Sequence, residues 1–244
     1  EFESVMTDWY KYIVQAGSHG VYSRYHVYAV QTPSSGTFKL QVLNYYADVN
    51  GSPESGLIDL RYSPMDASSP SGAVIDARAG GSSTSEDDPE NKYTYFNLTS
   101  GSEIELTDEE AATSLAWDVA FKRYNVKLNG GVSGPGGVVG YDFQFDREET
   151  NDEILEVTEE QALADFTAAN ASQLAGVTWR EDRIGSILQD SFVTGQDGRL
   201  EPNGYVFVLT GAAGNDYHKF VVTDLQYGDN GAPGRLEFRL AAID

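Results

Sequence analysis

The sequence predicts a mostly β protein, built of antiparallel β-sheets with one or two short helices. Apolar and polar residues alternate with period two over much of the chain, and these stretches are rich in aromatic and β-branched residues. Clusters of Gly, Pro, Asn and Asp separate them, and only two stretches carry a helix start signal. With 244 residues, of which 40% are hydrophobic and 12% aromatic, the chain can bury a core and is not a disordered protein.

The alternation predicts strands, in chain order, at 9–14, 25–31, 37–46, 57–62, 73–77, 92–98, 116–128, 140–145, 204–210, 217–226 and 235–241. The clearest turns between them are 50–53 and 230–233, which both read Asn-Gly-x-Pro. Capping boxes begin at Thr107 and Thr158. Apolar residues at helical spacing follow the second box and predict a helix near 159–173.

An internal repeat is the most informative feature. Residues 25–53 and 205–233 align without a gap at an offset of 180, and the match resumes at 58–62 over 236–240 after a two-residue deletion. The identical pairs are Tyr25/Tyr205, Lys39/Lys219, Val42/Val222, Asn50/Asn230, Gly51/Gly231 and Pro53/Pro233. Each copy reads as strand, turn, long strand, turn and strand, which predicts two three-stranded antiparallel meanders.

Three further runs of residues form a recognisable set. They are Val74-Ile75-Asp76-Ala77, the run from Tyr93 to Leu98, and the run from Trp117 to Val126 that leads into a Gly-rich turn. Together they resemble the HmuY family, haem-carrying surface lipoproteins of Bacteroidetes-type bacteria. The resemblance implies an HmuY-like, mostly β fold. It places a complete copy at about 72–244 and a C-terminal half copy, a three-stranded meander, at about 1–65. The Ser-, Pro- and Gly-rich residues 66–91 are then a linker or long loop, and 92–244 form the main part of the complete domain, with 73–77 as its first strand.

What the resemblance implies for function is haem capture by two axial side chains, typically His. His19 lies where the family carries a histidine, between the Trp9 strand and the next one, and a Gly-Ser-His-Gly turn is expected there. The corresponding stretch of the complete copy, 192–204, has no His. His19 and His218 are therefore the predicted haem-binding residues, and a Tyr is the remaining ligand type. His218 is alternatively a partly buried strand histidine, and His26 is expected at the surface.

The composition and motifs of the chain argue against several other classes of function. The net charge of −22 argues against nucleic acid and anionic membrane surfaces as partners. A chain with no Cys and three His offers no thiolate site and little for a multi-His metal centre. The acidic clusters at 86–88 and 146–153 do not follow EF-hand spacing, so no metal residues are assigned. Neither a Gly-x-Ser-x-Gly elbow nor a nucleophile beside a base is recognisable, and we expect no enzyme and no catalytic residues.

The leading hypothesis is therefore a non-enzymatic HmuY-like protein that binds haem or a related tetrapyrrole. The alternative is a surface structural or protein-interaction module of the same fold that has lost haem binding. Under the leading hypothesis the partners are haem or a haem-bearing protein. Under either hypothesis the meander edges offer self-association by strand pairing. Six Lys and 38 acidic residues are typical of a halophile. The family implies secretion or attachment to the outer membrane or cell surface. No apolar run is long enough for a membrane helix, and we expect the export signal and any lipid anchor upstream of Glu1.

Overall fold

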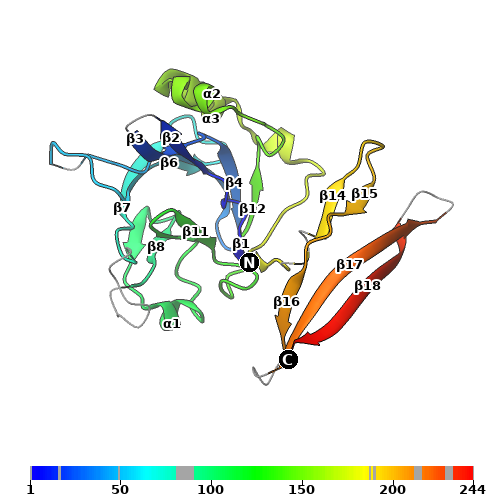
Figure 1. Cartoon of the computed structure of the whole chain (residues 1–244). Coiled ribbons are helices and arrows are strands. Elements are labelled where there is room, and N and C mark those ends of the chain that lie inside the picture. The colour runs from blue at the N-terminus through cyan, green and yellow to red at the C-terminus, as the bar shows by residue number, and fades with distance from the viewer. Residues whose placement is uncertain are drawn as a thin grey trace. The chain divides into compact units, whose positions relative to one another are not determined.

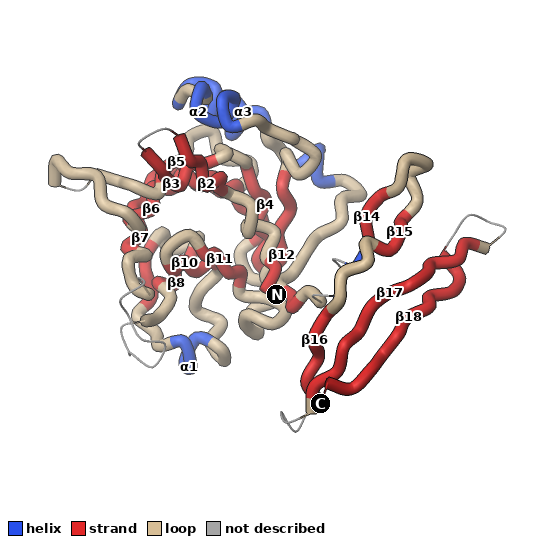
Figure 2. The backbone as a smooth tube through the Cα atoms, viewed as in Figure 1, coloured by secondary structure: helices blue, strands red, loops and turns tan. Residues whose placement is uncertain are grey.

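The computed structural model describes residues 2–15, 18–48, 50–80, 91–186, 188, 191–211, 216–228 and 233–243. Residues Phe2–Arg183 form one compact unit and Ile184–Asp244 a smaller one. Strands dominate both units, and short helices occur in the larger one (Figures 1 and 2). The predicted mostly β, antiparallel fold is thus confirmed. None of the described helices is long and apolar enough to cross a membrane.

The central sheet of the larger unit has five strands in the order β12-β4-β5-β6-β7, all antiparallel. Their bounds are β4 Val27–Thr32, β5 Gly36–Asn44, β6 Leu57–Pro64, β7 Ser71–Asp76 and β12 Val139–Asp142. The first predicted meander is therefore present as β4-β5-β6. Segment 66–91 contributes β7 to this sheet, whereas 81–90 lie outside the described residues.

A second sheet has the order β11-β10-β8-β9, with β8 Thr94–Asn97, β9 Ser102–Ile104, β10 Val119–Lys122 and β11 Asn125–Leu128. The single strand predicted over 116–128 is wrong, because the chain turns at Arg123 and Tyr124 and β10 pairs back with β11. Arg123 adopts a φ of 54°, and its side chain donates to the Ser55 carbonyl. An Arg-Tyr turn carries no Gly or Asn signal, so period-two alternation ran through it unbroken.

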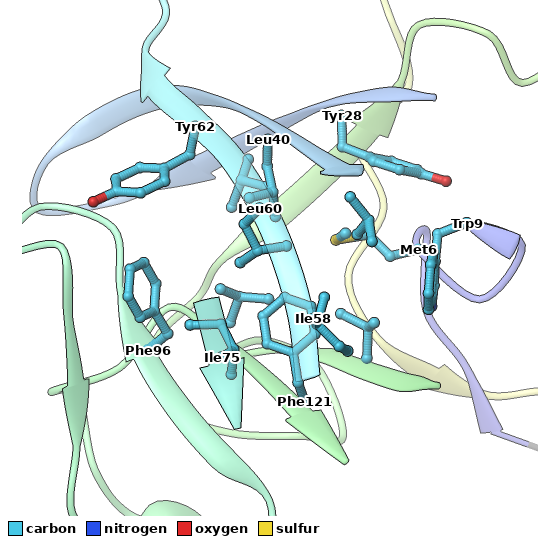
Figure 3. Packing of buried hydrophobic residues seen from close by; sticks show 14 of the residues in the cluster. Met6, Trp9, Tyr28, Leu40, Ile58, Leu60, Tyr62, Ile75, Phe96 and Phe121 are labelled. Atoms are coloured by element: carbon cyan, nitrogen blue, oxygen red, sulfur yellow. The ribbon is translucent and has the colours of Figure 1, made fainter. Parts of the chain in front are cut away.

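The two sheets bury their apolar faces against each other. Leu40, Ile58 and Leu60 of the first sheet are 0% exposed, and Phe121 of the second sheet belongs to the same cluster (Figure 3). This cluster also receives Trp9, whose indole N–H donates to the carbonyl of Tyr124 at 2.8 Å. The core therefore joins residues before 65 to residues after 92 in one unit, because neither sheet alone covers its apolar face.

Three α-helices and one 3₁₀ helix flank the sheets of the larger unit: α1 Asp108–Ala111, α2 Asn151–Glu156, α3 Glu159–Ala168 and η1 Ala171–Leu174. The capping boxes predicted at Thr107 and Thr158 are both formed. A third box at Thr150 begins α2, which the sequence reasoning missed. The helix α3 covers the outer face of the five-stranded sheet, where Lys39 donates to the carbonyls of Phe166 and Ala169 near its C-terminal end.

Two hairpins, two short strands and a three-stranded meander complete the list of described strands. In the larger unit β2 Tyr10–Gln15 pairs with β3 Ser18–Ser23. The two-residue strands β1 Phe2–Glu3 and β13 Arg183–Ile184 pair with each other. In the smaller unit β14 Phe192–Thr194 pairs with β15 Leu200–Pro202. The meander β16 Phe207–Thr210, β17 Tyr217–Tyr227 and β18 Pro233–Ile243 follows. The second predicted meander is thus also present, although its turn at 229–232 lies outside the described residues.

The repeat extends to a detail that the alignment did not contain. The register between β5 and β6 is interrupted between Val42 and Asn44, and that between β17 and β18 between Val222 and Asp224. The two irregularities lie at the same offset of 180. The hairpins β2–β3 and β14–β15 precede the two meanders in the same order. The assignment of about 1–65 to a half copy and of about 72–244 to a complete copy stays a prediction from the sequence. The compact units of the fold divide the chain at a different place, after Arg183.

Candidate functional site

The hairpin β2–β3 places the predicted residue His19 on a strand, beside aromatic side chains. The sequence expectation of a turn at His19 is wrong: His19 is the second residue of β3 and lies opposite Val14. Tyr12 and Val21 are the next pair on the same face of the hairpin. The Tyr12 hydroxyl therefore reaches His19, and Oη lies 2.6 Å from Nδ1.

A cavity of about 390 Å³ opens beside this pair. It is lined by His19, Val21, Ser55, Arg123 and five tyrosines: Tyr10, Tyr12, Tyr45, Tyr46 and Tyr124. Segments far apart in sequence meet here, because the turn between β10 and β11 supplies Arg123 and Tyr124 while the chain after β5 supplies Tyr45 and Tyr46. The volume lies within the range of small-molecule and cofactor sites.

The aromatic walls of this cavity are held by specific contacts. The Tyr10 ring lies 5.2 Å from the Tyr124 ring, and the Tyr45 ring lies 4.9 Å from the Tyr46 ring at an edge-on angle. The Tyr46 hydroxyl accepts the Val21 N–H at 3.0 Å. The tyrosine rings offer flat apolar faces, and their hydroxyl groups add a few polar atoms.

The charge of the cavity differs from that of the whole chain. Arg123 is a cation in the wall, with its guanidinium 5.7 Å from the centre of the Tyr45 ring, and the described residues that line the cavity include no carboxylate. Burial raises the pKa of both Tyr10 and Tyr45. These two phenols therefore stay protonated at neutral pH and are poor anionic ligands, which leaves the His19 imidazole as the better metal-binding group.

The Tyr12 contact determines which imidazole nitrogen is available. When Nδ1 carries the proton, it donates to the Tyr12 hydroxyl, and Nε2 keeps the lone pair that binds iron. A ligand histidine that donates its other N–H to a neighbouring group is the usual arrangement in metal sites. The residues that line the cavity therefore fit an iron porphyrin. They offer the His19 imidazole for the iron, tyrosine rings for the porphyrin plane and Arg123 for a propionate carboxylate.

The other predicted residue, His218, lies in the smaller unit on β17. Its side chain is 35% exposed, and Nε2 lies 3.7 Å from an oxygen of Asp216. At the repeat offset of 180, Val14 and His19 correspond to Thr194 and Arg199, and the hairpin β14–β15 contains no His. The smaller unit therefore repeats the hairpin without the imidazole.

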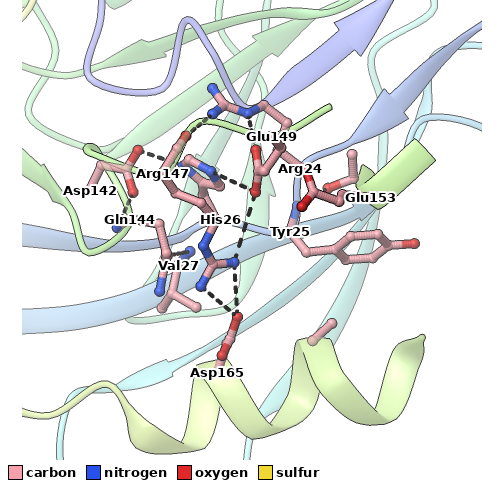
Figure 4. A network of polar contacts seen from close by, with 12 residues as sticks. Arg24, Tyr25, His26, Val27, Asp142, Gln144, Arg147, Glu149, Glu153 and Asp165 are labelled. Atoms are coloured by element: carbon pink, nitrogen blue, oxygen red, sulfur yellow. Dashed lines mark hydrogen bonds and ion pairs between the residues drawn. The ribbon is translucent and has the colours of Figure 1, made fainter. Parts of the chain in front are cut away.

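His26 was expected at the surface, and this is wrong. It is 2% exposed and lies between two carboxylates, with Nδ1 2.7 Å from Asp142 and Nε2 3.4 Å from Glu149 (Figure 4). Arg24 donates to Glu149 at 2.7 Å. The pairing of β12 with β4 brings Asp142 beside His26 from more than 100 residues away, and no local pattern contains that partner. We infer that this polar network links the start of β4 to β12 and to the segment that follows β12.

Other candidates are weaker. A cavity of about 420 Å³ beside this network is lined by Arg24, Asp142, Arg180 and Asp8 among others, and its described lining contains no imidazole. Within the ranges that the structure describes, no three His, Asp or Glu side chains gather to hold a metal ion. The acidic cluster 86–88 lies outside the described residues, and Thr150 and Glu153 of the cluster 146–153 form a helix cap.

Comparison with known proteins agrees with the motif resemblance. No curated protein matches the chain. A family model described as HmuY protein matches residues 89–240, which is more than half of the chain. This range contains the Trp117 motif, the second hairpin and the second meander, and it ends within β18. HmuY proteins are haem-binding proteins that are secreted or lie at the cell surface. The chain therefore belongs to the HmuY family.

Proposed function

We propose that this chain binds haem or a related tetrapyrrole in the cavity beside β2–β3, without catalysing a reaction, at the cell surface or after secretion. The observation that carries the proposal is His19, oriented by Tyr12 within an aromatic wall. His19 would bind the iron through Nε2, the tyrosine rings would contact the porphyrin, and Arg123 would pair with a propionate. His218 stays a predicted haem-binding residue.

The test is titration of the full-length chain with haemin, followed by the Soret absorbance. A shifted Soret band at micromolar protein is expected, and we expect His19→Ala to weaken haem affinity about 100-fold or more because it removes the iron ligand. Tyr12→Phe keeps the ring but not the hydroxyl, so it should weaken affinity between 10- and 100-fold. A wild-type chain that produces no Soret shift in high salt refutes the proposal.

His218→Ala is the matched histidine variant, because His218 is also on a strand but in the smaller unit. If His218 is the second ligand, the variant still binds haemin but loses the spectrum of a six-coordinate, low-spin iron. An unchanged spectrum would leave His19 as the protein's only histidine ligand and would point to a phenol or water at the other axial position.

Salt adaptation belongs to the same proposal. The chain carries a net charge of −22. In dilute salt its acidic groups therefore repel one another strongly, and they also repel the propionates of haem. We infer a halophilic origin. Raising KCl from about 0.1 M to about 2 M should therefore raise both the urea midpoint and the haem affinity, because the Debye length falls from about 10 Å to below 3 Å. A mesophilic acidic protein would show only a small change in the midpoint.

The second candidate is a surface interaction module that has lost haem binding. Two observations favour it: Arg199 occupies the repeat position of His19 in the second hairpin, and the second meander exposes apolar side chains. An absent Soret shift together with stable self-association would select this candidate.

A further inference from the structure

A cavity of about 420 Å³ lies beside β12, the edge strand of the five-stranded sheet, and we call it the β12 cavity. All the described residues that line it belong to the larger unit. None of them lines the cavity around His19. The β12 cavity is therefore a separate site, and its volume suits a small molecule or the end of a peptide.

The β12 cavity begins where a pair of extended segments separates. Gly140 of β12 and Arg180 exchange both main-chain hydrogen bonds, at 2.8 and 2.9 Å, as an isolated antiparallel bridge. If the pairing continued, Thr178 would lie opposite Asp142 as the next hydrogen-bonded pair. The bridge is not extended between these two described segments, and Asp142 and Thr178 both line the cavity instead. The cavity is therefore the gap that the two segments leave.

The main chain of Asp142 presents a donor and an acceptor to this gap. Along an antiparallel strand, successive residues direct their N–H and C=O groups to opposite edges. Gly140 bonds outward to Arg180, whereas Phe143 bonds inward, because its N–H donates to the Val27 carbonyl of β4 at 3.0 Å. The N–H and C=O of Asp142 therefore point outward, as those of Gly140 do. A strand edge of this kind can pair with an added extended segment.

Two arginines in the lining suit a carboxylate. Arg24 is held in place by Glu149 and by the carbonyls of Asp8 and Arg147 (Figure 4). These bonds leave further N–H groups of the Arg24 guanidinium without an acceptor among the described residues. The Arg180 side chain makes no hydrogen bond or ion pair with the part of the chain that the structure describes. Both arginines line the cavity, so both can donate to an anionic group there.

The rest of the lining suits an apolar side chain. Phe145 is 55% exposed, and its ring lies 6.1 Å from the Tyr141 ring. Val177 also lines the cavity. The Asp142 carboxylate is already bonded to the His26 imidazole at 2.7 Å. The cavity therefore combines an outward main-chain pair, cations and an aromatic surface, which together match one residue of an extended peptide with a free carboxylate.

We propose that the β12 cavity binds the apolar carboxyl-terminal residue of a peptide, or an N-acyl amino acid of the same chemistry. The amide N–H of the ligand donates to the Asp142 carbonyl, and the Asp142 N–H donates to a carboxylate oxygen, as in a hydrogen-bonded pair of an antiparallel ladder. Arg24 and Arg180 pair with the carboxylate. The apolar side chain of the ligand contacts Tyr141 and Phe145.

The test is isothermal titration calorimetry of the full-length chain with N-acetyl-L-phenylalanine, in about 2 M KCl to screen the net negative charge. We expect a dissociation constant of about 1 mM or below. The primary amide of this compound lacks the carboxylate, its N-methyl derivative lacks the N–H, and N-acetylglycine lacks the ring. Each should bind at least about 10-fold more weakly. An acetylated tetrapeptide ending in phenylalanine binds more tightly than N-acetyl-L-phenylalanine if the occupant is a peptide, and equally if it is a free N-acyl amino acid.

Charge variants of the lining test the orientation of the ligand. Arg180→Gln removes a cation that no described residue uses, and it should weaken binding at least about 10-fold. Asp8→Asn removes an exposed acid of the lining, and it should strengthen binding of the carboxylate. Arg183→Gln is the matched control, because Arg183 pairs with Glu3 and lines a neighbouring cavity but not this one. Circular dichroism checks that the variants fold.

Several outcomes overturn the proposal. The wild-type chain does not bind the compound, or the N-methyl derivative binds as tightly as the parent, which removes the main-chain pairing. Unchanged binding by Arg180→Gln, or weaker binding by Asp8→Asn, contradicts the placement of the carboxylate. A loss on Arg183→Gln moves the ligand to the neighbouring cavity, and a loss on His19→Ala moves it to the cavity around His19. Haemin binding by Arg180→Gln should match wild type, because the two cavities share no lining residue.

Discussion

Replacing Leu60 by alanine tests whether the first meander completes the core of the larger unit. Leu60 is 0% exposed and lies between the two sheets (Figure 3). Loss of a fully buried leucine side chain costs its transfer free energy and leaves a cavity, together roughly 3 kcal/mol. With a urea dependence of about 2 kcal/mol per M, the unfolding midpoint of this unit should fall by about 1.5 M.

Tryptophan fluorescence is the assay, because all three tryptophans, Trp9, Trp117 and Trp179, belong to the larger unit. The matched control is Phe238→Ala at the equivalent repeat position in β18, where the side chain is 55% exposed. Phe238→Ala removes at most about 1 kcal/mol of hydrophobic stabilisation, because the side chain is already half exposed. Since Phe238 belongs to the smaller unit, the urea midpoint reported by tryptophan fluorescence should not change.

Two results would contradict the placement of β4–β6 in the core. If Phe238→Ala lowers the tryptophan midpoint as much as Leu60→Ala, the second meander supplies core contacts to the tryptophan-bearing unit. An unchanged midpoint for Leu60→Ala would remove β6 from the core. Either result would refute the assignment of the buried position to β4–β6.

Three other substitutions test the larger unit. Burial raises the pKa of Asp182 to about 6, so its folded form holds a proton that the unfolded form has lost. Its contribution to stability therefore falls as pH rises from about 4 to about 6, and urea unfolding should show Asp182→Asn gaining up to about 3 kcal/mol over wild type across that window. A difference independent of pH would contradict this reasoning. A Cβ at Gly130 would collide with the Val138 carbonyl oxygen. We therefore expect Gly130→Ala to lower the free energy of unfolding by roughly 3 kcal/mol or more, measured by thermal unfolding. A variant as stable as wild type would show that the turn adjusts to the extra atom. Thr158→Ala removes the N-cap of α3 and should cost about 1 kcal/mol, whereas Thr158→Ser should cost little.

Much of the fold follows from local patterns. Alternation located most strands to within a few residues, and Thr107 and Thr158 identified two helix starts, because strand faces and caps are encoded by neighbours along the chain. The turn and the strands that the sequence patterns missed were missed for local reasons as well. The turn at Arg123 lacks turn residues, and the short strands β9, β14 and β15 contain too few residues to show a period.

The candidate site was predictable only in part. His19 was identified from its place in the HmuY-like motif, but its strand position and its Tyr12 partner were not. Arg123 and Tyr124 could be recognised as part of a conspicuous motif, yet nothing in that motif says that they face the hairpin around His19. Nor does the net charge of the whole chain predict that the described residues lining this cavity include no carboxylate.

By itself the sequence determined the fold class, the two meanders and the absence of thiolate chemistry, since these depend on composition and on residues close in the chain. Only the tertiary structure decided which meander is buried, because two nearly equivalent apolar faces require knowledge of what lies against each. It also decided that His26 is buried and that His19 is near five tyrosines. Asp142 beside His26, and Arg123 and Tyr124 beside His19, come from more than 100 residues away along the chain, and no local pattern contains them.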